Sequence, residues 1–162
     1  MDRRKFLATA AGTLAASSLP LYALGKERRS AFRSDLIVSD PAVLEALKAV
    51  RKTSFDCISV GVACLQHCEE QIFGGNAEMF KHCAISVHQM LPICEAVGTL
   101  AGHKAVRTRE LLDACINACK ECEEACKEHS SHFSMGHHQE CQACMEACRR
   151  CLEACTKLRD LM

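Results

Sequence analysis

The sequence has no tryptophan, only one tyrosine and three prolines, and its formal net charge is zero, because 20 Lys and Arg residues balance 20 Asp and Glu residues. A nucleic-acid-binding protein needs a positive face that displaces counterions, so this charge balance disfavours that class. A hydrophobic content of 49% also disfavours an acidic disordered chain. The few prolines and the lack of any useful period-2 alternation of apolar and polar residues favour a helical protein without a sheet.

Motifs for catalysis and for common cofactors are missing as well. No Ser/His/Asp set, phosphate-binding loop or pair of catalytic carboxylates stands out, so we expect no enzyme. No Cys-x2-Cys is followed by His, which excludes attachment of a c-type haem. The Cys-x2-Cys-x2-Cys-x3-Cys run of bacterial ferredoxins is also absent.

Cysteine is the residue in excess, with 14 in a chain of 162 residues, which is the length of one domain. None of the fourteen lies in the first 25 residues, where Arg3 and Arg4 precede an apolar stretch, residues 6–24. Residues 1–25 resemble a twin-arginine signal peptide, which exports folded proteins across a bacterial inner membrane. We expect a periplasmic protein; an uncleaved signal that anchors the chain in the inner membrane is the alternative. Residues 26–40 are expected to be a linker or a short leading segment.

Residues 41–162 show apolar residues and cysteines at the 3-4 spacing of helices that bury one face. Asp40 and Pro41 are typical of a helix start, and Thr108 is a plausible N-cap. Short connections between consecutive helices predict antiparallel neighbours. The expected fold is therefore all-α: an antiparallel up-down-up-down four-helix bundle with a cysteine-lined core. Its helices are expected at residues 41–73, 77–101, 108–129 and 137–161, with Pro92 kinking the second.

The cysteines occupy the inward positions where a bundle normally has Leu and Ile. The last two helices repeat one unit, Cys115-x3-Cys119-x2-Cys122-x3-Cys126 and Cys144-x3-Cys148-x2-Cys151-x3-Cys155. Buried cysteine can simply fill space, but so many on one face indicate another purpose. Disulfides within a helix would be strained, because residues three or four apart have Cβ atoms about 5–6 Å apart and a disulfide needs about 3.5–4.5 Å. Disulfides between helices remain possible.

Metal binding is the interpretation that the pattern favours, because sulfurs on adjacent helical turns can both reach one soft ion. Thiolates select Cu(I), Zn(II) or iron–sulfur clusters. A Zn(II) with four thiolates leaves about two negative charges in a closed core, whereas one Cu(I) per thiolate leaves about none. Charge therefore favours many monovalent ions, and zinc stays the competitor.

The two ends of the expected bundle differ. One end collects leucines and valines as an apolar plug, and six of the eight histidines gather at the other. Met79, His129 and His137 follow or precede a cysteine by one turn at the histidine end, so we expect an uptake port there. Met90 lies between Cys83 and Cys94 and is either a thioether ligand or core filling.

The twin-arginine signal, the four-helix pattern and the inward Cys-x3-Cys pairs together resemble the bacterial copper storage proteins of the exported branch. The resemblance implies a homotetramer of bundles whose core thiolates bind several Cu(I) ions per chain, with Met and His near the open end. It also implies a recipient of the copper, either a copper-requiring enzyme or a metallochaperone. The chain departs from the pattern at Gly61 and in the second helix, where Cys83 and Cys94 form no Cys-x3-Cys pair.

The resemblance makes all fourteen cysteines expected Cu(I) ligands, with two methionines and two histidines as further candidates. The full set is Cys57, Cys64, Cys68, Cys83, Cys94, Cys115, Cys119, Cys122, Cys126, Cys141, Cys144, Cys148, Cys151, Cys155, Met79, Met90, His129 and His137. Two other functions stay open: a zinc or broad soft-metal buffer, and a thiol-disulfide redox protein. The second is disfavoured, because reactive cysteines are usually few and exposed beside a positive group.

Overall fold

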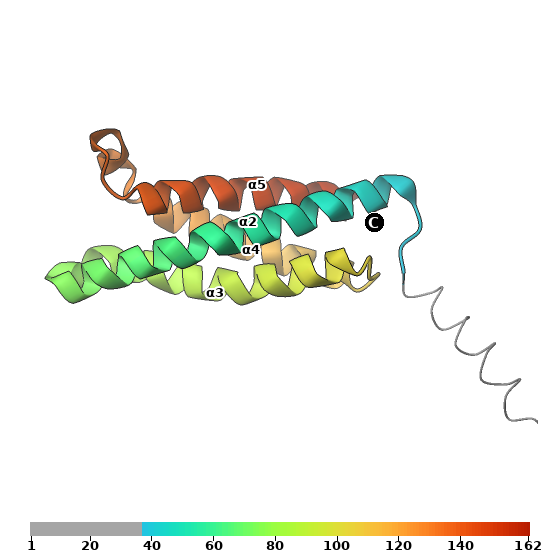
Figure 1. Ribbon diagram of the computed structural model, residues 1–162, viewed down its shortest axis with the longest axis horizontal. Coiled ribbons are helices and arrows are strands. Elements are labelled where there is room, and N and C mark those ends of the chain that lie inside the picture. The colour runs from blue at the N-terminus through green and yellow to red at the C-terminus, as the bar shows by residue number, and fades with distance from the viewer. Residues whose placement is uncertain (1–36) are drawn as a thin grey trace, which may run out of the picture. The chain divides into compact units, whose positions relative to one another are not determined.

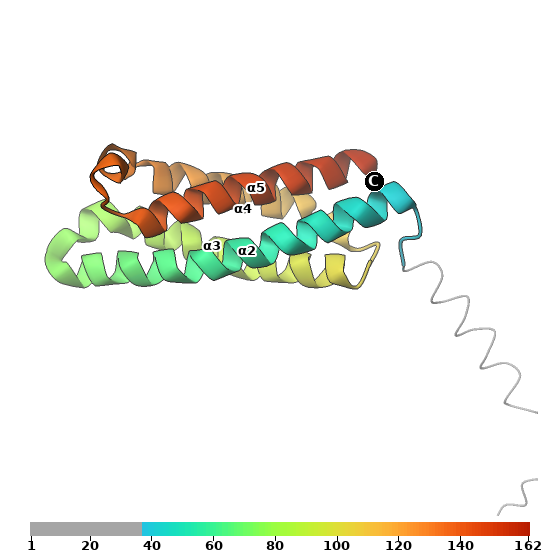
Figure 2. The ribbon, with the colours of Figure 1, turned by 45° about the horizontal axis from the view of Figure 1, so that its top comes forward.

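The computed structural model describes residues 37–162, so the predicted signal peptide at residues 1–25 and most of the predicted linker lie outside the described part. Four long helices make up this part: α2 (Pro41–Gln71), α3 (Ala77–Gly102), α4 (Thr108–Lys127) and α5 (Gln139–Leu161). Figures 1 and 2 show them side by side, with the C-terminus beside the start of α2.

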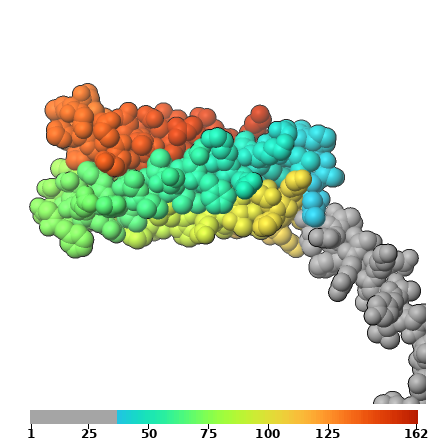
Figure 3. All heavy atoms as spheres, viewed as in Figure 1, coloured from blue at the N-terminus to red at the C-terminus, as the bar shows by residue number. Residues whose placement is uncertain are grey.

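Each helix contacts two neighbours: α2 and α4 both pack against α3 and α5. On the face of Figure 3, α2 lies between α5 and α3. Among residues 37–162, extended pairing is limited to one isolated bridge between Ile37 and Ala105. The predicted all-α, up-down-up-down four-helix bundle is confirmed.

The first helix begins where the sequence predicts it. Pro41 is the first residue of α2, and the Asp40 carboxylate accepts hydrogen bonds from the backbone N–H groups of Ala42 at 2.8 Å and Val43 at 3.0 Å. This cap satisfies two of the donors that a helix start leaves free. Pro92 lies inside α3 without ending the helix.

The predicted N-cap role of Thr108 is wrong. Thr108 is already helical, and its hydroxyl donates a hydrogen bond of 2.7 Å to the carbonyl of Ala105 instead of accepting one from the helix. The reason is the backbone before it: Arg107 has φ −66° and ψ −11°, so the chain enters α4 through a helical turn.

The other two connections are short turns. The π-helical turn η1 (Ile72–Asn76) joins α2 to α3 and reverses the chain at Gly75, whose φ of 98° favours glycine. The 3₁₀ turn η2 (Ser130–Met135) and Gly136, with φ 77°, join α4 to α5. His138 follows with φ 56°, so α5 begins at Gln139, two residues after the predicted start.

The predicted apolar plug closes the end of the bundle where α2 starts and α5 finishes. Its buried members come from all four helices: Leu47, Val50, Val97, Leu112 and Leu158. Leu161, at the last turn of α5, is 45% exposed and lies outside the plug. The plug separates the cysteines from solvent at this end.

Candidate metal centre

All fourteen cysteines are buried, with no exposed surface, and all are free thiols. Helical geometry explains the burial, because residues three and four apart share one face of a helix. The cysteines come from all four helices and meet along the axis of the bundle. The contacting sulfurs are 3.5 to 4.0 Å apart, well beyond the length of about 2.05 Å of a disulfide bond.

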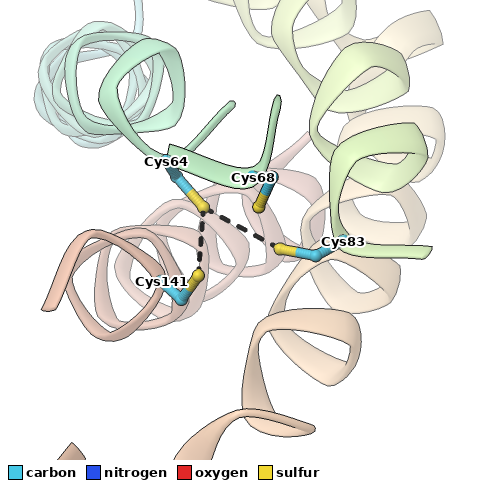
Figure 4. A group of neighbouring side chains, drawn as sticks. All are labelled: Cys64, Cys68, Cys83 and Cys141. Carbon is cyan, nitrogen blue, oxygen red and sulfur yellow. Dashed lines mark hydrogen bonds between the residues drawn. The ribbon is translucent and has the colours of Figure 1, made fainter. Parts of the chain in front are cut away.

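The first group of sulfurs lies near the end of the bundle formed by η1 and η2. Cys64 and Cys68 from α2, Cys83 from α3 and Cys141 from α5 have Sγ atoms within 4.8 Å of one another. Figure 4 shows the four side chains pointing toward a common point. The Sγ of Cys64 is 3.8 Å from the sulfurs of both Cys83 and Cys141.

A second group of four lies next to the apolar plug. Cys94 from α3, Cys115 and Cys119 from α4 and Cys151 from α5 again have all Sγ atoms within 4.8 Å of one another. Cys155 extends this group, because its Sγ is 3.7 Å from that of Cys115.

Three smaller groups connect the two ends. Their members have Sγ atoms within 4.8 Å of one another: Cys57, Cys119 and Cys148; Cys64, Cys126 and Cys144; Cys122, Cys144 and Cys148. Two sulfurs on one ion lie at most about 4.6 Å apart if each metal–sulfur bond is about 2.3 Å, the value for zinc thiolates. The sulfurs therefore form a continuous row in which neighbours can share an ion after small shifts.

Hydrogen bonds between the buried thiols shift their pKa values, some upward and some downward. Hydrogen bonds with Cys115 and burial raise the pKa of Cys94, Cys119 and Cys155. Hydrogen bonds with Cys119 in turn lower the pKa of Cys57 to about 6 and of Cys115 to about 5. Where the two shifts differ in direction, as at Cys94 and Cys115, the thiol with the lowered pKa gives up its proton more readily, because its neighbour stabilises the thiolate by donating to it.

Met90 lies inside the thiol row. It is fully buried, and the Cys57 thiol donates to its Sδ at 3.5 Å. The same Cys57 sulfur is 3.5 Å from the sulfur of Cys148. The position of Met90 therefore suits both interpretations of the sequence, a thioether ligand and core filling.

His129 lies inside the bundle at the histidine end. It is 1% exposed, and its Nε2 has no hydrogen-bond partner among the described residues. Its ring stacks on Phe80 with centroids 4.4 Å apart. An unpartnered buried nitrogen costs free energy, which a metal ion or a proton donor would recover.

Met79 and His137, two of the candidate ligands at the histidine end, both lie at the surface. Met79 is 52% exposed because Phe80, its neighbour in α3, takes the inward position. His137 is exposed because it precedes the start of α5 at Gln139. Their roles as ligands stay predictions.

Two further histidines at this end, His67 and His138, were not among the candidate ligands. His67 Nε2 and His138 Nδ1 share a hydrogen bond of 2.9 Å, and both rings contact Phe80 edge-on. Desolvation and the nearby histidines lower the pKa of His138. The backbone of His138 is left-handed where its ring lies against Phe80, and the sequence carries no clear signal for that conformation.

The interior of the bundle is a row of free thiols, with an apolar plug at one end and histidines at the other. This arrangement defines the class of proteins that hold several soft metal ions in a core. The comparisons name the family within that class. A family model described as copper storage protein matches residues 44–160, and the chain belongs to that family. It is a family of storage proteins and not of enzymes.

Two solved structures are similar. One is a cytosolic copper storage protein from Streptomyces lividans during copper loading, with five coppers; it is 24% identical, has a TM-score of 0.64, and the match covers 75% of this chain and 98% of that chain. The other is the copper storage protein Ccsp from Streptomyces lividans loaded with 10 copper equivalents, at 25% identity and TM-score 0.63, covering 76% and 95%. A search of curated proteins gave no match.

Proposed function

We propose that this chain stores copper as Cu(I), held by the core cysteines as thiolates, and that it catalyses no reaction. The observation that carries the proposal is the row of fourteen buried free thiols, thirteen of which fall into groups of three or four with sulfurs within 4.8 Å of one another. Thiolates prefer soft ions. One Cu(I) per thiolate leaves the buried row with a net charge of about zero, which avoids the desolvation cost of uncompensated charge in the core.

Zinc buffering is the second candidate, and the two groups of four sulfurs support it. The group around Cys64 and the group around Cys115 each offer the number of thiolates that a structural zinc site uses. Two such sites use eight of the fourteen cysteines, and each carries about two negative charges. Filling the remaining sulfurs with zinc would add more buried charge, so copper accounts for more of the core. A redox role is the weakest, because none of the thiols is exposed.

Copper enters, in this proposal, at the histidine end. The other end is closed by the apolar plug, and buried His129, one turn after Cys126 in the sequence, has an unpartnered nitrogen. Imidazole and thioether ligands bind Cu(I) without a proton to displace, so they can pass the ion on. His129 is the inner ligand of this port, and Met79 and His137 are exposed ligands that meet the ion first.

Location and assembly complete the proposal. Residues 1–25 would direct the folded chain through the twin-arginine route to the periplasm, or anchor it in the inner membrane if they are not cleaved. The bundles would associate as homotetramers, and the stored copper would pass to a copper-requiring enzyme or a metallochaperone. Export in the folded state suits a core whose thiols must reach an oxidising compartment without forming disulfides.

X-ray absorption at the copper edge tests the oxidation state and the ligands together. The reduced chain is loaded anaerobically with Cu(I), separated from unbound metal, and measured. We expect the edge of Cu(I) with sulfur as the dominant neighbour. A spectrum of Cu(II) with nitrogen and oxygen neighbours would overturn the thiolate store, and copper lost on separation, with zinc retained under the same treatment, would favour the zinc buffer.

A further inference from the structure

The four helices share one arrangement of inward positions, in which successive residues are four, three and four apart. Thirteen of the sixteen positions are cysteine, and the exceptions are Gly61, Val87 and Met90. The positions are Cys57, Gly61, Cys64 and Cys68 in α2; Cys83, Val87, Met90 and Cys94 in α3; Cys115, Cys119, Cys122 and Cys126 in α4; Cys144, Cys148, Cys151 and Cys155 in α5.

The three exceptions lie together in space, although they come from two helices. A Cβ at Gly61 would lie 2.9 Å from the Cε of Met90 and 3.7 Å from a methyl carbon of Val87. The first distance is too short for any side chain at position 61 unless Met90 moves. Gly61 therefore creates the space that the end of Met90 occupies, and the three residues form one unit on the wall between α2 and α3.

The orientation of Met90 places its sulfur, and not only its carbons, against the thiol row. The terminal Cε faces Gly61, while Sδ lies 3.5 Å from the Cys57 sulfur. Cys57 in turn lies 3.5 Å from Cys148 in α5, the other neighbour of α2. All three side chains have no exposed surface. Three sulfurs from α2, α3 and α5 thus meet at this level of the bundle.

We propose that Met90 is a thioether ligand of a Cu(I) ion held in the middle of the core by Cys57, with Cys148 as the neighbouring thiolate. A thioether is a soft donor that carries no charge. A Cu(I) bound by one thiolate and one thioether is neutral by itself, whereas two thiolates on one Cu(I) leave a negative charge that needs a second ion nearby. Gly61 provides the space for Met90, and Met90 together with Cys57 can therefore hold one Cu(I) without a second ion to balance its charge.

This inference rests on copper storage as proposed above, and selenium provides a readout that storage alone does not move. The chain is prepared with selenomethionine, reduced, loaded with Cu(I), and measured at the selenium absorption edge. The test variant is Met90→Leu and the matched control is Met145→Leu, a partly buried methionine of α5 outside the sixteen positions. Methionine-to-leucine exchange conserves volume, and cores tolerate it.

We expect copper among the selenium neighbours of the unsubstituted chain and of Met145→Leu, and a smaller copper contribution in Met90→Leu. Equal contributions in the two variants, with copper uptake intact, would overturn Met90 as a ligand and leave storage standing. If the unsubstituted chain took up no copper, storage itself would fail and this site with it. Circular dichroism of the three proteins confirms that each is folded.

Discussion

Replacing Cys115 with alanine separates the two roles that a buried cysteine can have in this core, packing and metal binding. The Sγ of Cys115 contacts three other sulfurs, those of Cys94 and Cys151 at 3.9 Å and that of Cys155 at 3.7 Å. Leu112 lies one turn earlier in α4, is equally buried, and belongs to the plug. Leu112→Ala is therefore a matched control that removes packing without removing sulfur.

The expected stability losses differ in size. Cys115→Ala removes one sulfur, comparable with a methylene group, so transfer and cavity effects together cost about 1–2 kcal/mol. Leu112→Ala removes three carbons and costs about 2–5 kcal/mol. For a bundle of this size about 1 kcal/mol corresponds to about 4 °C in Tm, so we expect shifts of about 4–8 °C and about 8–20 °C for the metal-free proteins.

The expected losses of copper run in the opposite order to the expected losses of stability. Cys115→Ala should hold about one Cu(I) less than the unsubstituted chain, because about one copper per sulfur is expected. The lost sulfur is also one that contacts three others in the row. Leu112→Ala should keep the full content. Copper is counted by competition with a chromogenic Cu(I) chelator, and Tm is measured on the metal-free samples. An unchanged copper content in Cys115→Ala, or an equal loss in both variants, would refute the reasoning.

Three further predictions concern the cap, the protons and the signal. Asp40→Ala removes both capping bonds of α2 and should cost about 1 kcal/mol in urea unfolding, without changing copper content; a cost near zero would show that the cap does not stabilise the bundle. Neighbouring thiols raise the pKa of Cys94 and Cys119, so these thiols hold protons at pH 7, and loading in unbuffered solution should release about one proton per thiolate formed and weaken as the pH falls; loading without proton release contradicts thiolate binding. Arg3→Lys with Arg4→Lys should retain the chain in the cytoplasm on cell fractionation, and unchanged export would rule out the twin-arginine route.

The fold was predictable because a single pattern repeats in all four helices. The 3-4 spacing of cysteines and apolar residues determines the inward face of each helix, and Gly75 and Gly136 mark reversals of the chain. Asp40 and Pro41 identified the first helix start correctly. The start of α4 was assigned correctly as well, but for a wrong reason, since Thr108 donates to a turn carbonyl and caps nothing.

The candidate site was predictable only along each helix. Spacing shows that Cys115 and Cys119 share a face, but the contact of Cys57 with Cys148 depends on the axial offset of α2 against α5, which no local pattern contains. Positions one turn from a cysteine were ambiguous for a similar reason. Residues three and four before Cys83 are both near its face, and the larger aromatic Phe80 takes the interior while Met79 turns outward.

An anaerobic Cu(I) titration of the fully reduced protein, read against a chromogenic chelator and repeated with Zn(II), tests copper storage most directly. The account predicts tight uptake that approaches the number of cysteines, 14 per chain, and weaker or less extensive uptake of zinc. Uptake of only three or four copper ions, with zinc held equally tightly, would contradict a storage core and leave a conventional metal site.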